Sequence, residues 1–312
     1  WARFGSAAAM ALSAAVAQAG DYGLAPFETA PGVYTFWGEQ ADLLPSNGGN
    51  IANAGFIVGA KSVLVIDAGP TRRYAEQMLD AIRATTDRPI IAVVVTHHHQ
   101  DHSFGIPVFV EHGLDVIMHP GAAAMLVRDG DILLNFVTEL VGAAWTDGTT
   151  IGAPTHPITE ATSIDLGDRD VDVEIFEGGH TPGDLVVYDG ATKTLFAGDL
   201  VFNGRVPTVP HGDVQTWRGQ LVTLDKWDWR RLIPGHGPLV ADRTVLDGMS
   251  DYLAFLEARV ACSYRMGDSP AETLMAEVPD AYTGLFGIDR EYQRAVLQLF
   301  RKYDETAPPP CP

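Results

Sequence analysis

The segment Thr96–His102 has the composition and spacing of a metal-binding loop. It reads THHHQDH and follows the β-branched run PIIAVVV, which predicts a strand buried on both faces. His97 and His99 lie two residues apart, so an extended or tightly turning backbone directs both imidazoles to one side and His98 to the other. Asp101 and a third imidazole follow at once. Polar groups packed this closely beside a buried strand need a compensating charge, and a metal ion would supply it.

Four further segments carry a histidine or an aspartate at a predicted strand end. They read IDAG, GGHTPGD, AGD and PGHG, and their glycines permit tight turns that present a side chain. The chemistry-bearing residues in these segments are Asp67, His180, Asp199 and His236.

The elements that position these residues follow from hydrophobic periodicity. In the first half we predict strands at 32–38, 52–58, 62–67 and 115–119, an amphipathic helix at 71–86 that crosses between parallel strands, and a helical stretch at 121–145 with breaks near Gly130 and Gly142. The second half predicts strands at 171–178, 185–189, 194–198 and 229–233 and a helix at 213–224. Two halves of this kind predict an α/β fold, a four-layer αββα sandwich with ligand loops at one edge.

The rest of the chain gives the expected domain boundaries. Residues 1–19 have one basic residue, an alanine-rich centre and an A-x-A site, the pattern of a secretory signal cleaved after Ala19. Residues 20–240 are expected to form the domain that carries these motifs, with a linker-like stretch at 21–31. Residues 241–305 form a C-terminal helical extension, and the proline-rich residues 306–312 a disordered tail. Cys262 and Cys311 permit a disulfide in an exported chain, and two free thiols fit equally well.

The five motifs, in this order, resemble the metallo-β-lactamase-like hydrolases from about Gly32 to about Val240. The resemblance implies a first metal held by His97, His99 and His180, and a second held by Asp101, His102 and His236. It also implies that Asp199 bridges the two metals and that Asp67 accepts a hydrogen bond from a ligand imidazole.

Five imidazoles with carboxylates and no thiolate suit two Zn²⁺ ions, and Fe or Mn would also fit. Two such ions can share a water, lower its pKa towards 7 and present hydroxide to a carbonyl-type carbon. Asp101 is expected to orient that water and to pass a proton to the leaving group.

Asp199 narrows the range of expected substrates, because the best known zinc β-lactamases have a cysteine at this position. An aspartate there resembles glyoxalase II-type thioesterases, lactonases and the SoxH-related group called quinoprotein relay system zinc metallohydrolases. The last resemblance implies a periplasmic partner, a PQQ-dependent oxidation system. Arg205 either meets an anionic substrate group or braces its loop. Three alternatives remain: a mononuclear iron persulfide dioxygenase, a β-lactamase, and a metal-binding accessory protein without turnover.

Composition limits the partners. The net charge of −19 over 312 residues would repel nucleic acid, so we expect a small-molecule substrate. Beyond the N-terminal segment no apolar run reaches the roughly 20 residues that span a bilayer, so we expect no membrane span in the mature chain.

Overall fold

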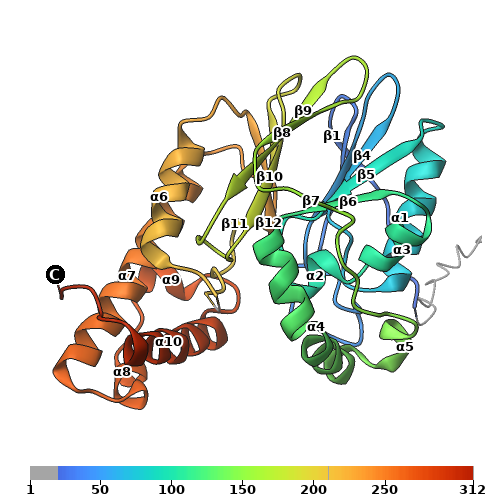
Figure 1. The fold of residues 1–312 in the computed structure, drawn as a ribbon. Coiled ribbons are helices and arrows are strands. Elements are labelled where there is room, and N and C mark those ends of the chain that lie inside the picture. Colours follow the sequence, from blue (N-terminus) through green and yellow to red (C-terminus); the bar gives the residue numbers. More distant parts are fainter. Residues whose placement is uncertain (1–19, 210, 312) are drawn as a thin grey trace, which may run out of the picture.

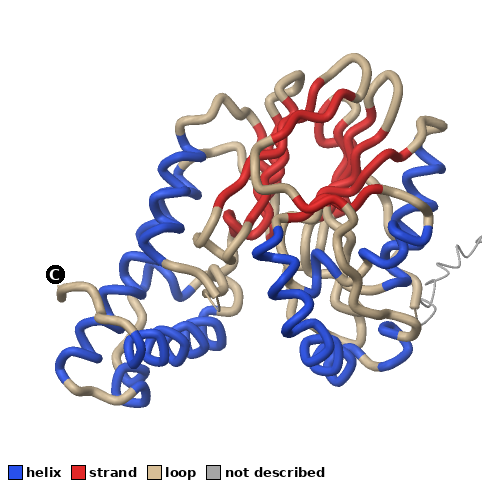
Figure 2. The backbone as a smooth tube through the Cα atoms, in the orientation of Figure 1, coloured by secondary structure: helices blue, strands red, loops and turns tan. Residues whose placement is uncertain are grey.

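The computed structural model describes residues 20–209 and 211–311, so the predicted signal segment lies outside the described residues. Two β-sheets face each other, and helices cover the outer face of each (Figures 1 and 2). The predicted four-layer αββα arrangement is therefore confirmed.

The first sheet has seven strands that follow one another in chain order. The pairs from β1 to β4 are antiparallel and those from β4 to β7 are parallel. The strands are β1 (Phe27–Ala30), β2 (Val33–Phe36), β3 (Ala54–Val58), β4 (Val63–Ile66), β5 (Ile90–Val94), β6 (Asp115–Met118) and β7 (His156–Pro157).

Helices on the outer face of this sheet fix where its parallel strands end. The crossover between β4 and β5 is α1 (Arg72–Thr85), whose first turn is capped by the Thr71 hydroxyl and whose apolar face is buried. The other helices of this half are α2 (Gln100–Ser103), α3 (Ile106–Glu111), α4 (Pro120–Val141) and α5 (Ala143–Thr146).

The second sheet has the strand order β12-β11-β10-β9-β8. Its only parallel pair is β11 with β12, joined by the crossover helix α6 (Val214–Asp225). The strands are β8 (Thr162–Asp165), β9 (Asp170–Phe176), β10 (Asp184–Asp189), β11 (Thr194–Phe202) and β12 (Arg231–His236).

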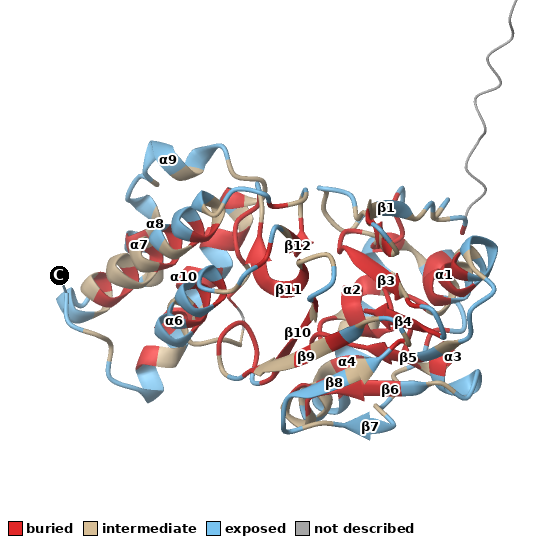
Figure 3. Cartoon of the chain, turned by 90° about the horizontal axis from the view of Figure 1, so that it is seen from above, coloured by how far each residue is buried: buried red, intermediate tan, exposed pale blue. Residues whose placement is uncertain are grey.

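Three clusters of buried apolar side chains hold the layers together. Figure 3 shows strands such as β4 and β11 as buried, whereas α9 is exposed. The cluster between the sheets includes Leu64, Val94 and Phe196, and each such side chain contributes roughly 1.5–3 kcal/mol by leaving water. The strands β5, β11 and β12, which lead to predicted ligands, are buried at the ends nearest those ligands.

The C-terminal extension is helical, as predicted, and shares one core with the second half of the sandwich. Trp217 of α6, Tyr252 of α7 and Val296 of α10 belong to the same buried cluster. The helices are α7 (Thr244–Met266), α8 (Pro270–Met275), α9 (Asp280–Thr283) and α10 (Ile288–Glu305).

Residues 306–311 form no helix or strand, and the predicted disorder of the tail at 306–312 stays a prediction. Cys311 forms a disulfide with Cys262 of α7, and Arg265 donates hydrogen bonds to the carbonyls of Pro308 and Pro309. These contacts attach the end of the tail to α7.

Two sequence predictions were wrong. The stretch 21–31 contains β1, whose pairing with β2 replaces the expected linker. Helix α4 runs through Gly130 without a break, because the glycine lets the helix lie close to Ile151: an added Cβ would lie 2.8 Å from that side chain. None of the helices in the described ranges combines the length and apolarity needed to cross a membrane.

Candidate metal centre

All predicted ligands lie at one edge of the sandwich, because the strands that deliver them end there. The histidine loop follows β5, His180 lies between β9 and β10, and His236 ends β12. Asp199 lies within β11, beside the end of the parallel strand β12. All seven are buried.

The first cluster contains His97, His99, His180 and Asp199. His99 Nδ1 lies 3.0 Å from His97 Nε2 and 3.1 Å from His180 Nε2. Asp199 Oδ2 lies 3.6 Å and 3.4 Å from the same two nitrogens. Four donors at 2.0–2.1 Å from a tetrahedral ion stand about 3.3 Å apart, so these atoms have the spacing of a tetrahedral metal site.

The second cluster contains Asp101, His102 and His236, and the other oxygen of Asp199 reaches it. Asp199 Oδ1 lies 3.2 Å from His102 Nε2 and 3.4 Å from His236 Nε2. Asp101 Oδ2 lies 3.3 Å from His236 Nε2 and 3.9 Å from His102 Nε2. Asp199 thus directs one oxygen to each cluster, the arrangement that a bridging ligand requires.

Two buried atoms that face each other in the second cluster lack a hydrogen-bond partner in the described residues. They are His102 Nε2 and Asp199 Oδ1, which face each other across the second cluster. Buried polar atoms are rarely left unpaired. The donor set and these orphaned atoms therefore fit a divalent metal pair.

The second ring nitrogen of each of four ligand histidines has a partner that fixes the ring. His102 Nδ1 lies 2.8 Å from Asp67 Oδ2, and His236 Nδ1 lies 2.8 Å from the Ile51 carbonyl. His97 Nδ1 lies 3.0 Å from Thr96 Oγ1, and His99 Nε2 lies 3.2 Å from His211 Nδ1. Such partners orient metal ligands and set their tautomers.

Sequence reasoning found Asp67 and missed the other three partners. Thr96 stands directly before the first ligand, a position from which its hydroxyl can reach the ring of the next residue. Ile51 acts through its backbone, and His211 is a single histidine in a loop, so neither carries a recognisable pattern. His98, predicted to face away from the ligands, lies outside both clusters.

The family model described as the metallo-beta-lactamase superfamily matches residues 47–236, which include every predicted ligand. The chain belongs to this superfamily. The Gallus gallus protein named acyl-coenzyme A thioesterase MBLAC2 is 29% identical over 226 residues, which cover 66% of this chain and 79% of that protein.

Solved structures of the superfamily show the same fold. A metallo-beta-lactamase from Pontibacter korlensis superposes with a TM-score of 0.61 at 20% identity, covering 74% of this chain and all but 1% of its own. A double mutant of the sec-alkyl sulfatase PisA1 superposes with a TM-score of 0.69 at 21% identity, covering 91% of this chain and 51% of its own. The second structure leaves only 9% of this chain unmatched. Because the C-terminal helices make up more of the chain than that, the similarity in fold extends into them.

The two clusters of this metallo-beta-lactamase superfamily site differ in charge. Burial lowers the pKa of His97 and His99 well below the usual value and that of His180 to about 4. In the second cluster burial opposes the charge of His102 and His236, but the surrounding carboxylates outweigh it. They raise the pKa of His102 well above its usual value and that of His236 to about 9.

Glycine makes room for the bridging carboxylate. A Cβ added at Gly235, in the PGHG motif, would lie 1.9 Å from Asp199 Oδ1. The glycine therefore serves the close approach of two strands here.

Arg205 braces its loop and is mostly buried. Its Nη1 donates a 2.9 Å hydrogen bond to the Ala41 carbonyl, and its guanidinium lies over the Phe286 ring. These contacts fit the bracing role, and the role towards an anionic substrate group stays a prediction.

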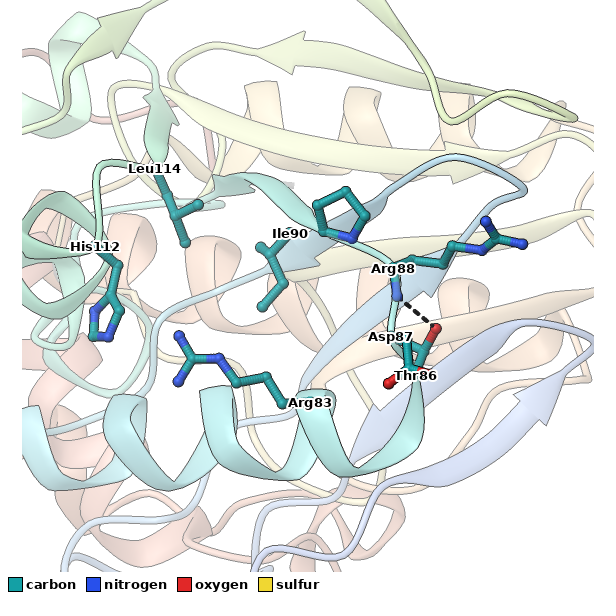
Figure 4. A pocket seen from close by; sticks show the side chains of 8 residues that line it. Arg83, Thr86, Asp87, Arg88, Ile90, His112 and Leu114 are labelled. Atoms are coloured by element: carbon teal, nitrogen blue, oxygen red, sulfur yellow. Dashed lines mark hydrogen bonds between the residues drawn. The ribbon is translucent and has the colours of Figure 1, made fainter.

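A pocket of about 320 Å³ lies at the other end of β5 (Figure 4). Arg83, Ile90 and His112 line it. Since Ile90 begins the strand that delivers the metal ligands at its far end, this pocket is separate from the candidate metal centre.

Proposed function

We propose that this chain is an exported binuclear metal-dependent hydrolase that cleaves thioester or related ester and lactone bonds of small molecules. The observation that carries the proposal is the pair of ligand clusters joined by the two oxygens of Asp199. A pair of divalent ions, when bound, supplies a hydroxide at neutral pH and polarises a carbonyl oxygen.

The protein's own groups then place and move the proton. Burial opposes ionisation of Asp101, yet His102 and His236 hold the pKa of this carboxyl below its usual value. Asp101 is therefore an ionised acceptor at neutral pH, suited to orient a water and later to transfer its proton to the leaving group. Thr96 and Asp67 keep the ligand rings in fixed orientations while charge changes beside them.

Two observations support a thioester or ester substrate. The bridging position is an aspartate, as the resemblance to thioesterases of the glyoxalase II type implies. The relative that is 29% identical is named an acyl-coenzyme A thioesterase. Zinc, as the metal in vivo, is proposed because imidazole-rich sites favour it.

Export is supported by the signal-like pattern of residues 1–19 and by the Cys262–Cys311 disulfide, since such bonds persist in oxidising compartments. We therefore propose a periplasmic or secreted location. The link to a PQQ-dependent oxidation system stays a prediction that rests on the resemblance alone.

The test combines metal content with a substrate panel. Protein purified from residue 20 without chelators should carry close to two ions per chain by plasma mass spectrometry. It should hydrolyse acyl-coenzyme A or glutathione thioesters or a lactone, lose this activity with a chelator and regain it with Zn²⁺. Asp101→Asn should lower kcat at unchanged fold, and a variant of the exposed His156, His156→Ala, should not.

Three results would contradict the proposal. A single iron with oxygen uptake on a persulfide would indicate the dioxygenase alternative. Turnover confined to β-lactams would indicate a β-lactamase. Two bound ions without turnover on any member of the panel would favour the accessory protein.

A further inference from the structure

A third group of histidines lies beside the first cluster: His98, His99 and His211. One ring nitrogen from each lies within 4.8 Å of the others. We propose that these three residues bind an accessory divalent cation of the imidazole-preferring class, Cu²⁺, Zn²⁺ or Ni²⁺, in addition to the two ions of the binuclear centre.

His98 supplies the main evidence. Its side chain is fully buried, and neither ring nitrogen has a hydrogen-bond partner in the described residues. Its ring centroid lies 4.6 Å from that of His99 and 4.9 Å from that of His211. Buried polar groups without partners are costly unless they bind something. A neutral His98 ring has one nitrogen with a free lone pair, and a cation bound at that nitrogen would give it a partner.

A hydrogen bond between His99 and His211 explains only part of this arrangement. That contact, 3.2 Å from Nε2 to Nδ1, uses one nitrogen of each ring and leaves His98 unpaired. A cation held by all three rings would also bind the one free lone pair of the His98 ring. Imidazole is the ligand that copper, zinc and nickel share.

The accessory site uses a different atom of His99 from the binuclear centre. His99 Nδ1 points into the first cluster and Nε2 points towards His211. A cation bound at Nε2 displaces the proton from that nitrogen to solvent, which leaves a bridging imidazolate. One proton is therefore released for each ion that binds. The affinity for the cation should be lower than at a site whose ligand nitrogens carry no proton to be displaced.

The surroundings are electrostatically mixed. Asp129 of α4 lies close enough to act on the charge of both His98 and His211, which favours a cation. Arg128 is bound to Asp129 through a 2.6 Å contact and offsets part of this effect. The site thus depends mainly on its three imidazoles.

The test titrates tag-free chain, already loaded with two Zn²⁺, with Cu²⁺. We expect calorimetry to show one Cu²⁺ bound per chain with release of one proton. Electron paramagnetic resonance should show nitrogen splitting, and mass spectrometry should show both zinc ions retained. His211→Ala should weaken Cu²⁺ binding by more than about 100-fold, because losing a ligand costs more than losing a ligand's partner. The matched control His156→Ala should bind Cu²⁺ as the native chain does.

His211 is only partly buried, so His211→Ala should fold. A second variant, His98→Gln, should likewise weaken Cu²⁺ binding. Equal Cu²⁺ binding in the native chain and His211→Ala, or Cu²⁺ uptake with loss of zinc, would overturn the inference. Fewer than two Zn²⁺ at the start would instead contradict the binuclear centre, so the two failures are distinguishable.

Discussion

At the scale of single residues, the ligand imidazoles differ most in what holds their outer nitrogen. The partner of His102 is a carboxylate, that of His97 is a hydroxyl and that of His236 is a backbone carbonyl. The partner of His99 is another imidazole. A carboxylate makes a ring more basic and a better metal ligand than a neutral acceptor does. The two metal sites should therefore respond to different substitutions.

We expect Asp67→Asn to weaken binding at the second site by about 10–100-fold and to affect the first site less. Asparagine tolerates the positive φ of 62° at this position, and its oxygen can still accept from the Thr96 amide. An NH2 group then replaces the Oδ2 atom beside His102, and it cannot accept a hydrogen bond from the ring. Stepwise Zn²⁺ titration against a competing chelator measures the two affinities.

Thr96→Val is the matched substitution for the first site. It removes the hydroxyl that contacts His97 Nδ1 and donates to Asp67 Oδ2 with little change in volume. Loss of affinity should be larger at the first site. If both variants weakened the same site equally, the assignment of partners to sites would be wrong.

The pH dependence of metal binding should also differ between the sites. His97, His99 and His180 have lowered pKa values, so they are neutral at pH 6–8 and release no proton to a metal. The pKa of His236 is raised to about 9, so below that pH a metal must displace its proton. Affinity at the second site should fall about tenfold per pH unit for each proton displaced.

Calorimetric titrations of metal-free chain at pH 6, 7 and 8 check this. The first ion should bind with nearly constant affinity, and the second should bind more weakly as the pH falls. Equal pH dependence for both ions would show that the carboxylates do not favour protonated His102 and His236.

At the scale of elements, the site depends on how closely β11 and β12 approach. Gly235→Ala should destabilise the fold by about 2 kcal/mol or more and weaken binding at the second site, because the methyl group would displace the Asp199 carboxylate. Gly248→Ala in α7 is the control: nothing lies within 4 Å of its added Cβ, so it should stabilise by roughly 0.5–1 kcal/mol. Urea unfolding and metal titration measure both.

If Gly235→Ala bound two ions with native affinity, the strands would have room that the structure does not show. If the variant were less stable than the native chain but bound both ions with native affinity, the added methyl group would strain β12 without displacing the Asp199 carboxylate.

The residues singled out from sequence lie together in the structure, whereas some elements were predicted less well. His97, His99, Asp101 and His102 lie within six positions of one another, and the other predicted ligands lie beside glycines at strand ends. The local sequence was therefore enough to single them out. His211 could not be found this way, because its role depends on a loop folding back beside β5. The same holds for β1, whose pairing with β2 has no strong local signal in its exposed residues.

Glycine was ambiguous at the level of sequence for a physical reason. It permits a turn, breaks a helix or allows close packing, and only the neighbours decide. Near Gly142 the break was predicted correctly, since this residue caps α4 with a positive φ of 94°. At Gly130 the neighbour is Ile151 and the helix continues.

At the scale of the whole molecule, the C-terminal extension is part of the core rather than an appendage. Helices α6, α7 and α10 share one buried cluster with β11, and Lys302 of α10 is paired with Asp213, the residue that caps α6. Because α6 leads into β12, a change in how the extension packs against α6 should shift β12, the strand that carries His236.

The disulfide fastens the end of this extension. It closes a loop with a sequence separation of 49 residues, and a crosslink over such a length contributes about 2–4 kcal/mol, mainly by restricting the unfolded chain. We expect Cys311→Ser, or reduction of the native chain, to lower the free energy of unfolding by this amount while leaving two ions bound. Urea unfolding with and without reductant, together with metal content, measures both effects.

Cys311→Ser should be insensitive to reductant, which serves as the internal control, and its stability should equal that of the reduced native chain. Native chain made in a reducing cytoplasm should contain two free thiols and show the lower stability, whereas chain exported to an oxidising compartment should show the higher one. A reductant effect on Cys311→Ser would place the sensitivity outside the disulfide. Equal stability of the oxidised and reduced native chain would mean that the contacts of Arg265 with Pro308 and Pro309 hold the tail by themselves.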